Sequence, residues 1–262
     1  PPFFFNDTAS TVTYTLTLHD ALPIYSRDEK VMVEFVSANP TGPMHMGNAR
    51  GGALGDCLAA VLDKAGYNAW REFYVNDAGN QIEKFGCSLE ARYLQIFKGD
   101  EIEFPEDGYQ GEDIKDLAKE YADLNGDSLV NVSAEERKKA LVDYALPKNI
   151  KKMQADMEKY KIFYDKWFFE SELHKSGAVK AVVDLLTEKG LTYEKEGAVW
   201  YKNKEVLTQK LLKEGKSQKY IDNLELKDDV LIRQNGNPTY FTADIAYHKN
   251  KFDRGFTTLI DV

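Results

Sequence analysis

The chain has 262 residues, 43% of them hydrophobic and 29% charged, with a formal net charge of −9. This composition is typical of a soluble globular protein, and the acidic balance argues against a generally basic nucleic-acid coat but not against a local basic patch for RNA. The sequence contains no apolar run near the roughly 20 residues of a membrane span, and its two cysteines lack CxxC spacing. We therefore expect a protein of the reducing cytoplasm with no membrane partner and no disulfide scaffold.

Residues 1–25 differ from the rest of the chain, because no Lys or Arg precedes Arg27. The stretch TVTYTLTL alternates polar and apolar residues, which is typical of an edge β-strand. However, the longer stretch FFFNDTASTVTYTLTLHDALPI closely resembles translated sequencing-adapter read-through. We therefore interpret residues 1–25 as a non-native segment and assign no function to them.

The stretch VEFVSANPTGPMHMGNARGGALGD, residues 33–56, predicts a strand, a loop and a helix. The nearly continuous apolar run 31–37 suits a buried parallel strand, and residues 47–65 have helical spacing that ends before Gly66. A second apolar strand follows at 69–75. This succession predicts a βαβ unit, and therefore a parallel sheet with a right-handed crossover.

Three residues, His45, Gly47 and Asn48, lie at the mouth of the first predicted helix. Backbone N–H groups and the positive end of the helix dipole converge there, which favours a phosphate. An isolated HxGN sequence is usually no more than a helix start. Its place between a buried strand and a helix predicts a nucleotide site.

The segment VNDAGNQIEKF, residues 75–85, follows the second predicted strand and predicts a helix that Asp77 would cap and that runs towards residue 97. Helix capping and a solvated helix face would account for Asn76, Asp77 and Gln81. The alternative is that they line a cleft, because the carboxyl ends of parallel strands face the ligand in such sheets.

The middle of the chain predicts helices at 112–124, from Ser133 to about residue 160, and at 175–189, with short strands at 192–194 and 198–201. Its aromatic run, FYDKWFF, predicts packing where this segment returns to the core.

The last part of the chain predicts a strand at 230–234, a turn at Asn235-Gly236, and a helix followed by a buried strand in TTLIDV. Tyr240 and Asp244 are four residues apart, which places them on one face of that helix or across its N-terminal turn. We expect His248 to pack or to lie at the surface, and Lys249 and Lys251 to be solvated. A sheet that ends at this strand lacks the next helix, so we expect the domain to be incomplete at its C-terminus.

Three segments taken in order, VEFVSANPTGPMHMGNARGGALGD, AGYNAWREFYVNDAGNQIEKF and PTYFTADIAYHKNKFDRGFTTLIDV, together resemble arginyl-tRNA synthetase, a class I aminoacyl-tRNA synthetase. The resemblance implies an α/β fold, with a Rossmann-type parallel sheet interrupted by a largely helical insert. It also implies a division of the chain: 1–25 as the non-native segment, 26–98 as the first half of the catalytic domain, 99–223 as the insert with the acceptor-end region, and 224–262 as a truncated return to the catalytic domain.

The resemblance implies that ATP, accompanied by Mg²⁺, activates L-arginine, and that the arginyl group passes from the adenylate to tRNA(Arg). The family signature His-Ile-Gly-His appears here as His45-Met46-Gly47-Asn48. His45 and Asn48 would be the catalytic pair, and with Gly47 they would bind ATP. Asn48 departs from the second histidine, because an amide keeps a donor but cannot become cationic.

The resemblance also implies an arginine pocket lined by Glu34, Asn39, Tyr240 and Asp244. Further residues of the cleft would be Ser37, Asn76, Asp77 and Gln81. An acidic residue inside an apolar strand needs a partner, and the positive side chain of the substrate would supply it for Glu34.

We expect a monomeric full-length enzyme without a protein-bound metal, and we expect the chain as given not to aminoacylate, since no KMSKS-like segment follows the last strand. One alternative is another nucleotidyltransferase with an HxGH-type helix mouth, such as a cofactor adenylyltransferase. The other is a non-catalytic tRNA-binding paralogue.

Overall fold

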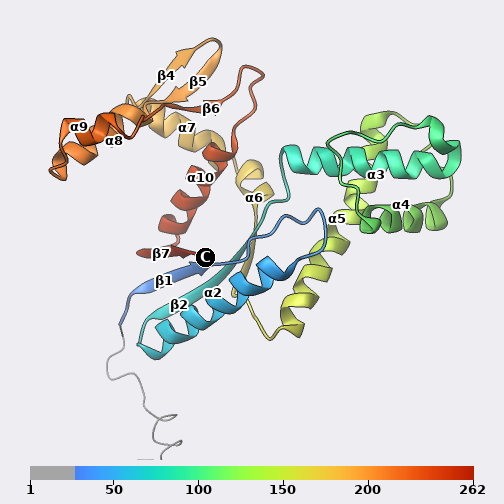
Figure 1. Ribbon diagram of the computed structural model, residues 1–262, viewed down its shortest axis with the longest axis horizontal. Helices are drawn as coiled ribbons and strands as arrows, with labels where there is room; N and C mark the ends of the chain where they lie inside the picture. The colour runs from blue at the N-terminus through green and yellow to red at the C-terminus, as the bar shows by residue number, and fades with distance from the viewer. Residues whose placement is uncertain (1–26) are drawn as a thin grey trace, which may run out of the picture.

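The computed structural model describes residues 27–262, so the interpretation of residues 1–25 lies outside the described part of the chain. The described residues form a parallel sheet with helices on both faces, a module of three long helices, and a small antiparallel sheet (Figure 1). The strands are β1 (Lys30–Glu34), β2 (Asn68–Val75), β3 (Lys166–Phe169), β4 (Thr192–Lys195), β5 (Ala198–Tyr201), β6 (Asp229–Ile232) and β7 (Thr258–Asp261). The helices are α2 (Met46–Lys64), α3 (Asn80–Lys98), η1 (Gly99–Glu101), α4 (Glu112–Asn125), α5 (Ala134–Lys159), α6 (Glu170–Lys175), α7 (Ala178–Glu188), α8 (Asn203–Lys213), α9 (Gln218–Asp222) and α10 (Tyr240–Asp253).

The parallel sheet has the strand order β3-β2-β1-β7, which confirms the predicted α/β fold with a parallel sheet. Its edge strand β3 lies inside the range 99–223 that we expected to be an insert. Trp167 of β3 is paired with Phe73 of β2, and the two rings stack with centroids 4.1 Å apart. The aromatic run therefore packs as predicted, but it does so partly as a strand that the sequence did not reveal.

Strand β1 ends at Glu34, three residues earlier than the predicted strand 31–37. Val36 and Ser37 have φ angles of 70° and 43°, in the left-handed region that a strand cannot contain. The Ser37 hydroxyl accepts a hydrogen bond from the Tyr74 N–H of β2 at 3.2 Å, so a side chain continues the contact between the two strands. The chain consequently turns away from the sheet directly after Glu34.

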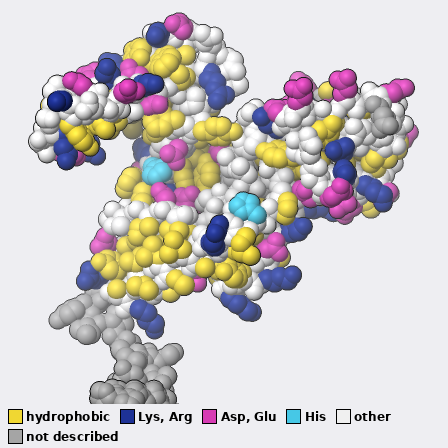
Figure 2. All heavy atoms as spheres, in the orientation of Figure 1, with side chains coloured by type: hydrophobic (Ala, Val, Ile, Leu, Met, Phe, Trp, Pro, Cys, Tyr) yellow, Lys and Arg dark blue, Asp and Glu magenta, His cyan; other side chains and the backbone are white. Residues whose placement is uncertain are grey.

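The residues of β1 alternate between the two faces of the sheet. Val31, Val33 and Phe35 pack against the face covered by α2, whereas Glu34 contacts residues of α10 on the opposite face. Helix α2 lies so close to Phe35 that a Cβ atom added at Gly55 would be 2.2 Å from the Phe35 ring. The outer side of α2 carries exposed apolar side chains, including Leu54 and Val61 (Figure 2).

Helices α3, α4 and α5 form a separate packed module, whose core contains Phe85, Tyr93, Ile114 and Leu141. Helix α5 begins after Ser133, whose side chain accepts from the Glu136 N–H at 3.2 Å, as the sequence predicted. The far end of α5 reaches the parallel sheet, where Met153 packs with Phe73 and Val75. Helix α5 thus connects the helical module to the strands.

The small antiparallel sheet has the order β4-β5-β6. The predicted turn at Asn235-Gly236 follows β6 and returns the chain to α10, with the Arg233 N–H donating to the Asn237 carbonyl at 2.9 Å. None of the helices between residues 27 and 262 combines the length and apolarity needed to cross a membrane.

Candidate active site

A cavity of about 350 Å³ lies at the carboxyl ends of β1 and β2, beneath the first turns of α10. We call it the acidic pocket, because three of its residues are carboxylates. Its lining consists of Glu34, Tyr74, Asn76, Glu170, Tyr240, Phe241, Asp244 and Tyr247. One cavity therefore brings together four of the predicted site residues: Glu34, Asn76, Tyr240 and Asp244.

Glu34 already has a cation from its own chain. Its Oε2 accepts from the Lys251 Nζ at 2.6 Å, and its Oε1 accepts from the Ser37 hydroxyl at 2.8 Å. Lys251 has no exposed side-chain surface and also donates to Asp261 at 3.1 Å. The expectation that Lys251 is solvated is wrong, and the charge of Glu34 does not depend on a substrate for its partner.

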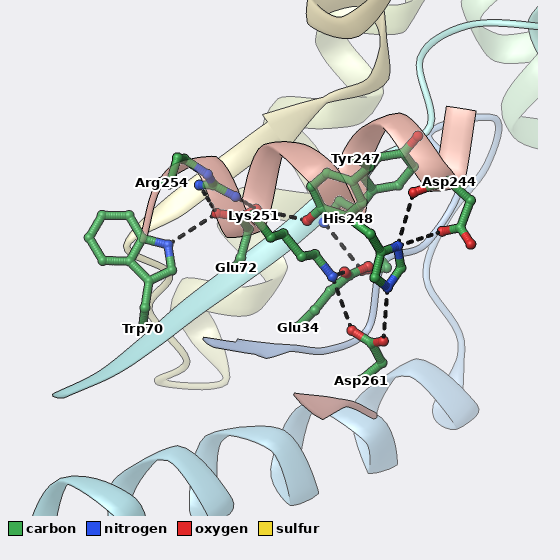
Figure 3. A network of polar contacts seen from close by, with 11 residues as sticks. Glu34, Trp70, Glu72, Asp244, Tyr247, His248, Lys251, Arg254 and Asp261 are labelled. Atoms are coloured by element: carbon green, nitrogen blue, oxygen red, sulfur yellow. Dashed lines mark hydrogen bonds and ion pairs between the residues drawn. The ribbon is translucent and has the colours of Figure 1, made fainter. Parts of the chain in front are cut away.

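Asp244 lies at the open side of the acidic pocket, with its side chain 62% exposed. The His248 Nδ1 is 3.3 Å from its Oδ1, and the His248 Nε2 is 3.7 Å from Asp261 (Figure 3). The neighbouring carboxylates of Asp244 and Asp261 raise the pKa of His248 to about 10. His248 is therefore a cation at neutral pH and holds Asp244 in place.

Glu170 is the carboxylate of the pocket that sequence reasoning missed. Its side chain is only 4% exposed, and its Oε2 accepts from the Tyr74 hydroxyl at 2.9 Å. Burial and the neighbouring Glu170 carboxylate raise the pKa of Tyr74, so the phenol stays protonated and donates. Glu170 directly follows β3, as Asn76 follows β2, and recognising β3 as a strand would have revealed it.

The segment before α3 differs from its prediction at Asp77. Helix α3 begins at Asn80 after Gly79, and the Asp77 Oδ1 accepts from the Ser171 N–H at 2.8 Å instead of capping the helix. Gln81 is buried, and its amide donates to the Ala78 carbonyl at 2.6 Å and accepts from the Tyr240 hydroxyl. Gln81 thus contacts Tyr240 of the pocket, whereas Asp77 joins the loop after β2 to α6.

A second cavity of about 500 Å³ adjoins the acidic pocket, because both are lined by Glu170 and Tyr240. His174 and Arg233 also line it. Asn39 is exposed and lines neither of these two cavities.

The N-terminus of α2 is capped by the side chains of His45 and Asn48. The His45 Nδ1 accepts from the Gly47 N–H at 3.1 Å, and the Asn48 Oδ1 accepts from the His45 N–H at 3.0 Å. The two side chains form a reciprocal capping box, and His45 is exposed. Their contacts here are those of a helix start, so phosphate binding by His45 and Asn48 stays a prediction.

Within residues 27–262, no group of three or more His, Cys, Asp or Glu side chains is arranged to hold a metal ion.

The sequence matches the family model described as tRNA synthetases class I (R), catalytic domain, over residues 11–259. It is 57% identical over 238 residues to the arginine–tRNA ligase of Acetivibrio thermocellus, covering 90% of this chain and 39% of that protein. It is 59% identical over 237 residues to the arginine–tRNA ligase of Caldanaerobacter subterraneus, covering 90% of this chain and 39% of that protein. The chain therefore spans about two fifths of the length of these relatives.

Solved structures agree with the sequence matches. A Campylobacter jejuni structure assigned as an arginyl-tRNA synthetase has a TM-score of 0.75 and 33% identity, covering 97% of this chain and 51% of that chain. Thermus thermophilus arginyl-tRNA synthetase, with a TM-score of 0.59 and 22% identity, shares the fold. The family match spans the strand, loop and helix of β1 and α2 and the helix α10 that roofs the acidic pocket. This chain belongs to the class I tRNA synthetase (R) catalytic-domain family.

Proposed function

We propose that the protein to which this chain belongs is an arginine–tRNA ligase. It activates L-arginine with ATP, accompanied by Mg²⁺, and transfers the arginyl group to tRNA(Arg). The arginine carboxylate attacks the α-phosphate, the bond to the β-phosphate breaks, and pyrophosphate leaves. The terminal ribose hydroxyl of the tRNA then takes the arginyl group and releases AMP. We further propose a cytoplasmic protein that is monomeric at full length.

The acidic pocket is the observation that carries this proposal. Glu34 is neutralised by Lys251, and Asp244 is paired with His248. Glu170 is buried, and within residues 27–262 its one ion-pair partner is His174 at 3.4 Å, which is charged only when protonated. A guanidinium supplies a permanent positive charge and a planar fork of donors that suits carboxylate oxygens. We therefore assign Glu170 as the main partner of the arginine side chain, with Asp244 and Tyr240 at the entrance.

The N-terminus of α2 is the proposed place for ATP. His45 and Asn48 lie at its first turn, and a side chain at Gly47 would meet the His45 ring at 2.9 Å. Positive charge from the helix end and donors from His45 would stabilise the charge that develops on the phosphate oxygens as pyrophosphate departs. Ser37 supports Glu34, and Asn39, Asn76, Asp77 and Gln81 remain proposed residues of the cleft.

Amino-acid binding by this chain tests the proposal directly. Isothermal titration calorimetry should show L-arginine binding at least about tenfold more tightly than L-citrulline, whose neutral urea group has nearly the same shape as the guanidinium. L-lysine, with a single ammonium, should also bind more weakly. Equal affinity for arginine and citrulline would contradict the pocket assignment. Binding of tRNA(Arg) that neither arginine nor ATP influences would favour a non-catalytic paralogue.

A further inference from the structure

Lys251 is a charged residue without exposed side-chain surface, which is rare for lysine. Its ammonium contacts Glu34 of β1 at 2.6 Å and Asp261 of β7 at 3.1 Å, and it lies 4.4 Å from the centre of the Tyr247 ring. Neither cavity at the candidate active site is lined by Lys251. It therefore approaches Glu34 from the protein side and leaves the acidic pocket open.

The register of the sheet explains why a cation is needed there. Glu34 is the Cα partner of Glu72 in β2 and of Asp261 in β7. We call these three residues the acidic row. Neighbouring strands are about 4.8 Å apart, so three carboxylates in register repel one another unless cations separate them.

One side of α10 supplies the cations. His248, Lys251 and Arg254 recur every three residues along the helix, and we call them the basic row. His248 faces Asp261, Lys251 faces Glu34 and Asp261, and Arg254 faces Glu72 (Figure 3). The two rows together fix α10 across three neighbouring strands, β2, β1 and β7.

Within the acidic row, Glu34 alone lines the acidic pocket. Its side chain is 14% exposed, and its two oxygens are held by Ser37 and Lys251. Without Lys251, Ser37 would be the one hydrogen-bond donor left to this carboxylate within residues 27–262, and Glu72 and Asp261 would repel it. The position of the Glu34 carboxylate in the pocket thus depends on a residue outside the pocket.

We propose that Lys251 is a positioning residue of the amino-acid site, which holds Glu34 in the orientation that the ligand meets. This inference rests on the proposed function. The groups that face the Glu34–Lys251 pair are Asp261 from β7, Tyr74 and Glu72 from β2, and Tyr247 and His248 from α10.

Arginine binding to Lys251→Met tests the proposal, since methionine keeps the apolar stem without the charge. Affinity should fall by about tenfold or more in protein that circular dichroism shows to be folded, because a misplaced carboxylate loses a charge-assisted hydrogen bond. Lys249→Met is the matched control, because Lys249 is exposed on the same helix and pairs with Asp253. The control should bind arginine as the unmodified chain does. Undiminished affinity in folded Lys251→Met would overturn the proposal.

A double-mutant cycle in urea separates this inference from the proposed function. Lys251→Met should lower the unfolding midpoint sharply, and Lys251→Met with Glu34→Gln should regain most of the loss, because a neutral amide needs no cation. Additive losses in the cycle would overturn the role of Lys251, whether or not arginine binds. If the unmodified chain does not bind arginine, the proposed function is contradicted. A non-additive cycle would then still show that Lys251 stabilises the Glu34 carboxylate.

Discussion

Arg254, the C-cap of α10, holds Glu72 of β2 with two hydrogen bonds of 2.6 Å, one to each carboxylate oxygen. Glu72 is completely buried and accepts further hydrogen bonds from Tyr247 at 2.8 Å and Trp70 at 3.0 Å. Burial alone would raise the pKa of Glu72, but the hydrogen bonds from Arg254, Tyr247 and Trp70 outweigh it and lower that pKa. This pair attaches the helix that carries Tyr240 and Asp244 to the centre of the sheet.

Arg254→Met should lower the free energy of unfolding by about 3–5 kcal/mol, because it leaves a buried carboxylate without its cation. Urea denaturation followed by circular dichroism measures the change. Arg254→Met combined with Glu72→Gln should be more stable than Arg254→Met alone. A loss below ~1 kcal/mol in the single variant would show that water reaches Glu72.

The pH dependence of stability should reflect the contacts of His248. Its pKa is raised from 6.5 to about 10, chiefly by Asp244 and then by Asp261, so its stabilising contribution is fully present below pH 6.5 and is lost as the pH rises to 10. His248 and Lys251 lower the pKa of Asp261 from 3.8 to about 2, so that contribution is lost as the pH falls from 3.8 to 2. Thermal unfolding midpoints should fall between pH 7 and 10, and His248→Gln should flatten this alkaline decline. An equal decline in the variant would contradict the assignment.

Glu170→Gln should weaken arginine binding more than Asp244→Asn. The Glu170 side chain is 4% exposed and that of Asp244 is 62% exposed. Loss of a buried charge partner costs about 2–5 kcal/mol, whereas an exposed pair contributes about 0.2–1 kcal/mol. Calorimetric titration with L-arginine gives both values. A larger loss of affinity in Asp244→Asn than in Glu170→Gln would indicate that the guanidinium binds at the entrance of the pocket and not in its interior.

Two glycines one turn apart in α2 should respond oppositely to the same substitution. A Cβ at Gly55 would lie 2.2 Å from the Phe35 ring, whereas a Cβ at Gly51 meets nothing within 4 Å. Gly55→Ala should destabilise the chain by about 1–3 kcal/mol through overpacking, and Gly51→Ala should stabilise it by about 0.5–1 kcal/mol. Urea unfolding of both variants measures the difference. Equal effects would mean that α2 does not lie so close to β1.

His45→Asn should separate the two roles of His45, the cap of α2 and the proposed contact with phosphate. Asparagine is a good N-cap, so the free energy of unfolding should stay within about 0.5 kcal/mol of the unmodified chain. ATP binding, measured by calorimetry with Mg²⁺ present, should weaken because the imidazole is gone. His45→Ala is the comparison variant, because it removes both the cap of α2 and the imidazole. Its free energy of unfolding should fall by about 1 kcal/mol more than that of His45→Asn. Unchanged ATP affinity in His45→Asn would leave His45 as a cap alone.

Local sequence patterns predicted most of the elements. The helical spacing of α2 and the apolar runs of β1 and β2 predicted the α/β fold with a parallel sheet, because these signals arise from neighbouring residues. The errors occurred where a distant contact decides the backbone. Ser37 leaves the strand to meet Tyr74, Asp77 turns from its helix to Ser171, and β3 pairs with β2, which lies far earlier in the chain.

The sequence by itself determined the family, the strand–loop–helix that contains His45, Gly47 and Asn48, and four residues of the acidic pocket. Only the tertiary structure decided how their charges are balanced. Glu34 and Lys251 are 217 positions apart, and their pairing follows from the register that aligns Asp261, Glu34 and Glu72 under one side of α10. Hydrophobic periodicity specifies which face of an element is buried. The electrostatic partner of a buried charge depends on which strands and helices become neighbours, and that is settled only when the whole sheet assembles.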